Sequence, residues 1–506
     1  MQSKPSQTCH GGVSSIQQSF SEKGEKRFSR AWLGLLIFTI VLQVLSVWNL
    51  KLSDRDSPRV AGIAREMAIT SNYLIPRLNG ENFLEYPPLG YWPIALSLSM
   101  SEKPPDILAF LPLVFFATGT VLITFLVGKR LAVERIGLIA GFILSTTLGF
   151  VSLHRHCRVD PVLLFFITLS MYGFAAGYQT SRKSFLFPAV FYVSMAGAFL
   201  SKGIIGASIP TATAVVFLIT RKDLKGIRKL LLSPGILIFL LPVLLWGGTV
   251  AWTEGPGTFE EVIRQSLHRF FSPSADQGEP LYYYFIPAFL YLMPWTLLPL
   301  VLLWYRRDPN HSGEPLPYSF LLRFALVWFL TVFIGLSLAS AKRCLYLGPM
   351  LPPFALLAAL GWDRIRERVP RVKRVEIYGL IVIFLCYIGT YLFFIFPSEK
   401  QQNLRPVFEA VLSQRTHGAV YLVNPSERLR GAAFFYVGKR TPVLNSQDLL
   451  LGRFEDQPGT TLVIDSYYDD NQLFPTLQSK GYRLFLQKKY GKASGVCVYS
   501  NGPRRD

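Results

Sequence analysis

"AWLGLLIFTIVLQVLSVWNL" (residues 31–50) is followed, after one lysine, by "LSDRDSPRVAGIAREM" (residues 52–67). The first stretch carries no charge and is long enough to cross a bilayer as a helix. The second stretch mixes charges with apolar residues at helical spacing, and Ser57 and Pro58 suit the start of a helix. The apolar positions are Val60, Ile63, Ala64 and Met67, and Arg59, Arg65 and Glu66 fall on the other, polar faces. We therefore expect the chain to leave the membrane into a short helix that lies on its surface.

Apolar runs of similar length recur through the first 400 residues of this 506-residue chain, in which 50% of the residues are hydrophobic. This pattern predicts a multi-pass helical membrane protein with about eleven or more spans. The candidate spans are 31–50, 107–128, 136–153, 161–178, 184–201, 203–220, 231–252, 281–305, 319–338, 345–361 and 376–396.

The formal net charge is +20, which raises the question of a nucleic-acid partner. The basic residues, however, form short clusters between apolar runs, so membrane orientation explains them and no nucleic-acid partner is expected. The basic residues of the tail 1–30 predict that this end lies in the cytoplasm, and alternation then places the other Lys- and Arg-rich loops there as well. An odd number of spans then places the C-terminal segment outside.

Four basic segments fall on the outer side, against the usual orientation bias. They are "HRHCRVD" (154–160), Lys202 in "LSKG", "IRQSLHRF" (263–270) and "SAKRC" (340–344). Several converging cations would bind an anionic headgroup such as a lipid phosphate. The alternative is that each cation snorkels to the membrane interface, which is the better interpretation of any one of them. For all four on one side, we favour a shared anion site.

Two long outer segments, 51–106 and 253–280, each contain an amphipathic helical pattern. Within the first, "GENFLEYPPLGYWPIALSLSM" (80–100) brings Glu85 to a Pro-Pro turn before a short apolar stretch. That stretch is too short for a span and predicts a re-entrant or surface helix. The apolar face in the second segment consists of Phe259, Ile263, Leu267, Phe270 and Phe271.

The composition changes near residue 399, where short strand-like runs alternate with helical stretches. The strand-like runs are "GAVYLV", "TPVLN", "TTLVIDS" and "YRLFLQ", and the helical stretches are 404–415 and 470–480. This pattern predicts a small α/β domain over 399–506. This domain could recognise the acceptor or pack over the outer loops, and the sequence does not decide between these two roles.

The segment "DSPRVAGIAREM…YLIPRLNGENFLEYPPLGYWPIAL" resembles the first outer loop of the polyprenyl-phosphate-sugar glycosyltransferases. These are the GT-C membrane enzymes that include the aminoarabinose-to-lipid A transferases and the protein mannosyltransferases. The resemblance continues in order through "RVDPVLLFF", "LSKGIIGASIP", "EPLYYYFIPAFLYLMPW" and "AKRCLYLGPMLPPFALL". It implies a mainly α fold in the inner membrane: a GT-C transmembrane domain over 31–398, followed by the extracytoplasmic α/β domain.

The resemblance also implies a function and a set of site residues. The family passes a sugar from a polyprenyl-phosphate donor to an acceptor on the outer face of the membrane. Its first-loop aspartate matches Asp56, its Arg-x-Asp matches Arg158 and Asp160, and its lysine matches Lys202. A carboxylate can deprotonate the acceptor hydroxyl, and cations can stabilise the departing phosphate.

We accordingly expect Asp56 and Asp160 to be catalytic, with Asp160 orienting a cation or a sugar hydroxyl. The expected phosphate-binding residues are Lys202, Arg343, Lys342, Arg158 and Arg269, and the expected substrate-binding residues are Glu85 and Tyr346. Simpler structural roles compete with the two catalytic assignments. Asp56 is favoured at a helix entrance by the helix dipole, and Asp160 can cap the span that begins at Pro161. We interpret Tyr282, Tyr283, Tyr284, Trp92 and Trp295 as interfacial aromatics.

The sequence departs from the family pattern at several positions. The usual Asp-Glu pair is Asp56-Ser57, and the acidic-Lys-Pro-Pro signature reads Glu85-Tyr86-Pro87-Pro88. The histidine that joins the glutamate at a metal in the aminoarabinose transferases aligns with Ser266, two residues from His268. Glu85 and His268 are therefore weak candidates for a divalent metal, no cofactor is certain, and we expect weak metal dependence or none. These departures favour membership of the broader family over the aminoarabinose subgroup.

The sequence leaves the acceptor open between a lipid A-like glycolipid and a protein, with membrane lipids as further partners. A transporter or flippase of lipid-linked sugars is the alternative function, because it too would have many spans and polar groups. The sequence shows no internal repeat, and its unusual charges gather on one side rather than at mid-membrane. Both features favour the transferase.

Overall fold

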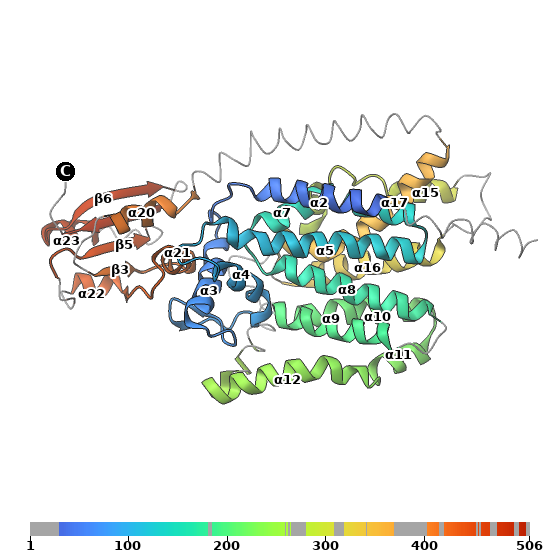
Figure 1. The fold of residues 1–506 in the computed structure, drawn as a ribbon, viewed down its shortest axis with the longest axis horizontal. Helices are drawn as coiled ribbons and strands as arrows, with labels where there is room; N and C mark the ends of the chain where they lie inside the picture. Colours follow the sequence, from blue (N-terminus) through green and yellow to red (C-terminus); the bar gives the residue numbers. More distant parts are fainter. Residues whose placement is uncertain are drawn as a thin grey trace, which may run out of the picture.

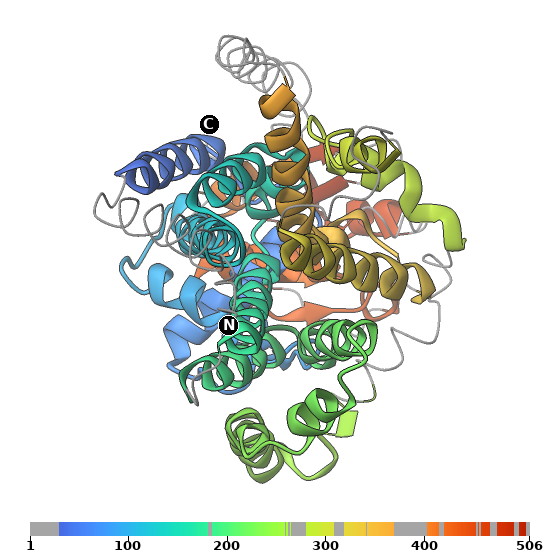
Figure 2. The same cartoon turned by 90° about the vertical axis from the view of Figure 1, so that its right-hand side faces the viewer.

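The computed structural model of the chain describes residues 30–180, 185–258, 260–261, 264, 280–307, 318–340, 342–368, 402–413, 419–451, 454, 457–465, 473–489 and 495–501. A bundle of long helices leads into a smaller α/β domain, and the first outer loop lies between the two (Figure 1). Viewed end-on, the α/β domain lies behind the bundle (Figure 2). The predicted fold class, a polytopic helical domain followed by a small α/β domain, is confirmed.

The helical bundle is built from apolar helices that pack mainly as sequence neighbours. Its elements are α2 (Ala31–Val47), α5 (Ile107–Leu131), α6 (Glu134–Thr146), α7 (Leu148–Arg155), α8 (Asp160–Gln179), α9 (Leu186–Lys202), α10 (Ile204–Thr220), α11 (Leu224–Leu231), α12 (Gly235–Glu254), η2 (Leu281–Tyr284), α14 (Phe285–Tyr291), α15 (Leu300–Arg307), α16 (Ser319–Leu338), η4 (Cys344–Met350) and α17 (Leu351–Arg368). Among the described residues, five helices are long and apolar enough to cross a membrane, or six if the bent pair α6–α7 is one span. The apolar helices α2, α9 and α10 have 17 residues each.

Two predicted spans differ from straight helices. The span 136–153 bends by 57° between α6 and α7, where Thr147 is extended. Hydroxyl back-bonding in this Ser/Thr run loosens the helix, since the Thr147 hydroxyl donates to the Ile143 carbonyl. The span 281–305 is wrong as one helix, because prolines lacking an N–H interrupt it between α14 and α15. The predicted span 376–396 lies outside the described residues.

The first outer loop folds into α3 (Ser57–Thr70), the hairpin β1 (Arg77–Leu78) and β2 (Glu81–Asn82), η1 (Pro88–Gly90) and α4 (Trp92–Leu98). Helix α3 has its predicted start, with Pro58 in its first turn. It does not lie open on a surface, because most of its residues are buried, including Arg65 and Glu66 on the supposedly polar face. Arg65 donates to the carbonyls of Leu98 and Ser101 at the end of α4. Helix α4 is a short helix and not a span, as expected.

The C-terminal domain contains α20 (Arg405–Ser413), β3 (Val420–Val423), α21 (Glu427–Val437), β4 (Val443–Leu444), α22 (Ser446–Leu450), β5 (Thr461–Asp465), α23 (Leu473–Ser479), β6 (Arg483–Lys489) and β7 (Gly495–Ser500). The strand order is β4-β3-β5-β7-β6, with β3 parallel to β4 and β5 and the β5–β7 and β7–β6 pairs antiparallel. The predicted strands coincide with β3 to β6. The sequence prediction lacked β7 and α21, and α21 is the helix that packs against α3.

Candidate active site

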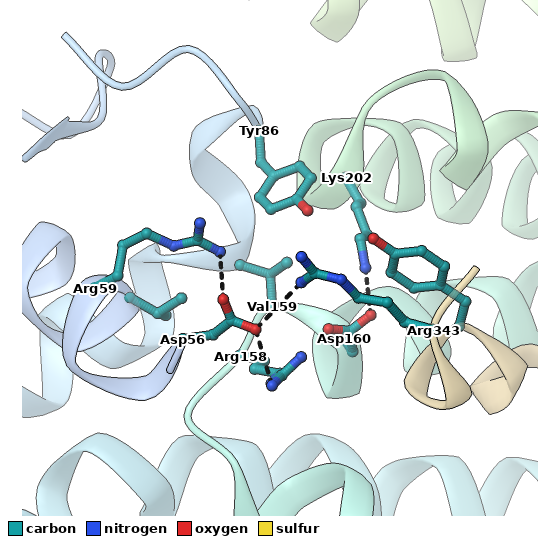
Figure 3. A pocket seen from close by; sticks show the side chains of 10 residues that line it. Asp56, Arg59, Tyr86, Arg158, Val159, Asp160, Lys202 and Arg343 are labelled. Carbon is teal, nitrogen blue, oxygen red and sulfur yellow. Dashed lines mark hydrogen bonds and ion pairs between the residues drawn. The ribbon is translucent and has the colours of Figure 1, made fainter. Parts of the chain in front are cut away.

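A small polar cavity lies where the first outer loop meets the ends of α8, α9 and η4. Its lining is drawn from segments far apart in the chain: Asp56, Arg59, Val60, Tyr86, Arg158, Val159, Asp160, Lys202, Arg343 and Tyr346. Figure 3 shows the charged side chains pointing toward one another across it. The tertiary fold thus brings together Asp56, Arg158, Asp160, Lys202, Arg343 and Tyr346 from the residues singled out in the sequence.

Asp56 occupies the N-cap position of α3, but its carboxylate makes no cap hydrogen bond. Instead, Oδ1 lies 3.1 Å from Nη2 of Arg59, and Oδ2 lies 2.8 Å from Nη2 of Arg158 and 3.6 Å from Nη1 of Arg343. The three guanidinium groups surround one nearly buried carboxylate (Figure 3). The helix-entrance explanation for Asp56 therefore accounts for its position in the chain but not for where its side chain points.

Arg158 is itself held by two carboxylates. Its Nη2 lies 3.2 Å from Asp54 Oδ2, and that oxygen also lies 3.5 Å from Nδ1 of His156. Burial alone would raise the pKa of Asp54, but the hydrogen bond with His156 and the charge of Arg158 hold that pKa well below its ordinary value. Burial would lower the pKa of Arg158, yet Asp56 and Asp54 raise it above its ordinary value. Arg158 is thus fixed in its charged form beside Asp56.

Asp160 and Lys202 meet because α8 and α9 form an antiparallel pair. Asp160 is the first residue of α8 and Lys202 the last of α9, and the lysine Nζ lies 2.5 Å from Asp160 Oδ1. Each charge has the sign that its helix end favours. Lys202 also lies 4.9 Å from the ring centre of Tyr346 and 5.5 Å from that of Tyr86. Val159, not Asp160, is the N-cap residue of α8, and the carboxylate of Asp160 contacts the cation.

Arg343 precedes η4 in an extended conformation, which directs it toward Asp56. Tyr284 anchors this segment: its hydroxyl accepts a hydrogen bond from the Arg343 amide at 3.1 Å and lies 3.3 Å from the Arg343 carbonyl. The interpretation of Tyr284 as an interfacial aromatic is therefore wrong, because it is fully buried and supports a site residue. Exposed Tyr282 fits that interpretation better.

The remaining predicted residues lie outside the cavity lining or outside the described residues. Lys342 is buried, and its Nζ donates to the Ala339 carbonyl at the end of α16, so its neighbour Arg343 alone of the pair reaches the cavity. Glu85 lies behind the lining, 3.2 Å from Nη1 of Arg59. Arg269, His268 and the aromatic face Phe259 to Phe271 fall outside the described residues.

Four lining residues were not predicted as site residues from sequence: the apolar Val60 and Val159, and the two with polar side chains, Arg59 and Tyr86. Arg59 was assigned to the polar side of a surface helix, although its i, i+3 spacing from Asp56 places a guanidinium beside that carboxylate. Burial would lower the pKa of Arg59, but Glu85 and Asp56 raise it, so the group stays charged. Tyr86 stands at the lysine position of the acidic-Lys-Pro-Pro signature, and its aromatic ring faces Lys202. The backbone at Gly90 packs closely on Val159, since a Cβ at Gly90 would lie 2.6 Å from the Val159 side chain.

In the part of the chain that the structure describes, the candidate metal ligand is Glu85. Within those residues no three His, Cys, Asp or Glu side chains converge as ligands. Glu85, the carboxylate suggested as a ligand, faces the guanidinium of Arg59. The guanidinium of Arg59 already pairs with the negative charge that would attract a metal cation to Glu85.

The charges of the cavity suit an anion. Four cations and two carboxylates line it; Asp54, Glu85 and Glu427 pair with Arg158 and Arg59 from outside the lining, which leaves Lys202 and Arg343 with the fewest carboxylate partners. The cavity measures about 20 Å³, room for one water-sized group, so a phosphate must displace part of the ion-pair network to enter. Arg343 is the cation best able to move, because it has the longest contact with Asp56 and its side chain is 32% exposed, against 13% for Arg158.

The chain is similar to known proteins over much of its length. The family model of dolichyl-phosphate-mannose-protein mannosyltransferases matches residues 85–246. The undecaprenyl phosphate-alpha-4-amino-4-deoxy-L-arabinose arabinosyl transferase of Shewanella sediminis is 25% identical over 79% of this chain and 73% of its own length. The Proteus mirabilis protein described as undecaprenyl phosphate-alpha-4-amino-4-deoxy-L-arabinose arabinosyl transferase 2 is 26% identical over 71% of this chain and 64% of its own length.

Two solved structures share the fold. ArnT from Cupriavidus metallidurans bound to undecaprenyl phosphate superposes with a TM-score of 0.71 at 15% identity, over 94% of this chain and 98% of its own. The Archaeoglobus fulgidus oligosaccharyltransferase superposes with a TM-score of 0.54 at 11% identity, over 94% of this chain and 75% of its own. At these identities the superpositions bear on the fold alone.

The bundle and the family match make the chain similar to one class of proteins, the multi-pass GT-C membrane glycosyltransferases. Within that class it resembles the aminoarabinose transferases, which account for several of its matches across the helical domain.

Proposed function

We propose that this protein transfers a sugar from a polyprenyl-phosphate donor to an acceptor hydroxyl at the outer face of the cytoplasmic membrane. The observation that carries the proposal is the cavity in which Asp56 lies among Arg59, Arg158 and Arg343 beside the Lys202–Asp160 pair. A base beside cations that can receive the charge of the departing phosphate is what displacement of a phosphate from a sugar requires.

Asp56 is the proposed general base. Its two oxygens have about four lone-pair directions, so it can accept an acceptor hydroxyl while retaining its arginine partners. The acceptor oxygen would attack C1 of the sugar as its proton passes to the carboxylate. The C1–O bond to the phosphate would break in the same displacement, and the electron pair would leave with the phosphate.

Lys202 and Arg343 are the proposed phosphate ligands. The leaving phosphate gains negative charge as the bond breaks, and fixed cations in a cavity of low dielectric stabilise that charge strongly. Lys202 is held in place by Asp160 and two tyrosine rings, whereas Arg343 is the more exposed. We propose that Lys202 fixes the phosphate and that Arg343 turns from Asp56 to contact it.

The donor class is supported by the arabinosyl transferase relatives and by the ArnT structure bound to undecaprenyl phosphate. We propose undecaprenyl phosphate as the lipid carrier and a lipid A-like glycolipid as the acceptor, with a protein acceptor as the alternative. Whether the sugar is a pentose or a hexose is left to the assay. The proposed topology has a cytoplasmic N-terminus and an outer C-terminal domain.

The test is sugar transfer by purified protein in detergent, using radiolabelled undecaprenyl-phosphate aminoarabinose and mannose donors with lipid A as acceptor. We expect label in the lipid A fraction with one donor, and loss of that label with Asp56→Asn. Lipid analysis of a deletion strain would identify the native product. Transport of intact donor across vesicles without transfer to lipid A or envelope protein would overturn the proposal.

A further inference from the structure

The C-terminal domain reaches the catalytic cavity through one helix, α21. The backbones of α21 and α3 touch: a Cβ on Gly62 would lie 2.4 Å from the carbonyl oxygen of Gly431, so only glycine fits. Neighbouring contacts fix the docking. Asn79 and Thr441 exchange two hydrogen bonds, and Arg428 donates to the Ser53 carbonyl at 2.7 Å. The domain is therefore seated firmly on the loop that carries Asp56.

Glu427, the first residue of α21, contacts the site directly. Its Oε2 lies 2.6 Å from Nη1 of Arg59, closer than the 3.2 Å between that nitrogen and Glu85. The other terminal nitrogen, Nη2, faces Asp56. A guanidinium is a rigid planar fork, so holding one nitrogen fixes the direction of the other. Glu427 thereby aims Arg59 at the catalytic carboxylate, although 368 positions in the chain separate the glutamate from that arginine.

We propose that Glu427 is a positioning residue for sugar transfer, and that the C-terminal domain forms part of the active site through the relay Glu427–Arg59–Asp56. The burial of Arg59 supports this relay. The side chain of Arg59 is 12% exposed, and the three carboxylates around it are its ion-pair partners, so its orientation depends on them. The inference rests on the proposed transferase function, since it assigns the relay to the base of that reaction.

The test compares two carboxylates that join the same surfaces. Glu81 on β2 pairs with Arg430 of α21, and its side chain is 60% exposed, matching the 58% of Glu427, but its partner is not in the cavity lining. We would prepare Glu427→Gln, Glu427→Lys and Glu427→Asp, together with Glu81→Gln and Glu81→Lys. For each variant, kcat, the donor KM and the thermal unfolding temperature would be measured on full-length protein.

We expect Glu427→Gln to lower kcat about two- to fivefold, the scale of a partly exposed ion pair, with the donor KM nearly unchanged. Glu427→Lys should lower kcat further by repelling Arg59, and Glu427→Asp should restore part of the loss. The Glu81 variants should keep normal kcat. If both sets reduce kcat equally, or if folded Glu427→Lys keeps normal kcat, the relay is wrong. A wild-type protein without transfer activity would instead overturn the proposed function.

Discussion

Oδ2 of Asp56 lies 2.8 Å from Nη2 of Arg158, and this contact joins the first outer loop to the segment before α8. The two residues are distant in sequence and meet at the end of the bundle that faces the α/β domain. Their pairing draws Asp56 away from the amides of its own helix and into the cavity. The fold thereby turns a helix-entrance carboxylate into a group available to substrate.

Asp56→Asn should reduce turnover by about a hundredfold or more, because asparagine keeps the size but lacks the basic oxygen. Transfer would be measured on protein whose unfolding temperature matches the wild type. Asp223→Asn is the matched control, since Asp223 also stands at a helix N-cap, where it accepts from the Gly226 amide far from this cavity. Asp54 is unsuitable as a control, because it shares Arg158 with Asp56. Near-normal transfer by the Asp56→Asn variant would remove Asp56 from the mechanism.

Lys202→Ala and Arg343→Ala should each weaken binding of undecaprenyl phosphate by about tenfold or more, since hydrogen bonds to charged groups contribute roughly 1.5–3 kcal/mol. Binding would be followed by titration into detergent-solubilised protein. Lys225→Ala, on the exposed helix α11, should bind normally. Equal affinity of all three variants would exclude the shared phosphate site.

Tyr346→Leu should weaken undecaprenyl-phosphate binding about two- to tenfold, because it removes the ring that lies 4.9 Å from Lys202. Tyr346→Phe keeps the ring and should bind like the wild type. A loss of affinity in Tyr346→Phe equal to that in Tyr346→Leu would point to the hydroxyl instead. The same titration distinguishes the two outcomes.

Removal of divalent metal should leave transfer largely intact, because fixed cations can receive the phosphate charge and Glu85 already faces Arg59. The measurement is turnover after dialysis against a chelator, with and without added zinc or magnesium. Activity that the chelator abolishes and zinc restores would contradict this expectation. It would make His268 a ligand to test by substitution.

Much of the architecture could be predicted from local patterns. Long apolar runs require helices in a bilayer, because each backbone polar group must find its partner within the same segment. The exceptions are the bend at Thr147 and the break between α14 and α15, where hydroxyls and prolines compete with the helix hydrogen bonds. Basic residues that the predicted topology places against the orientation bias drew attention to Arg158, Lys202 and Arg343, all of which line the cavity.

The sequence by itself determined the residue types of the site and the helix on which Asp56 stands. Tertiary structure decided which charges meet. Lys342 and Arg343 are neighbours in sequence, yet one bonds a helix end and the other faces Asp56. Arg59 faces Glu427 only because α21 packs on α3. Ion pairing depends on distances of a few ångströms between side chains, and those distances are set by packing of segments that no local pattern relates.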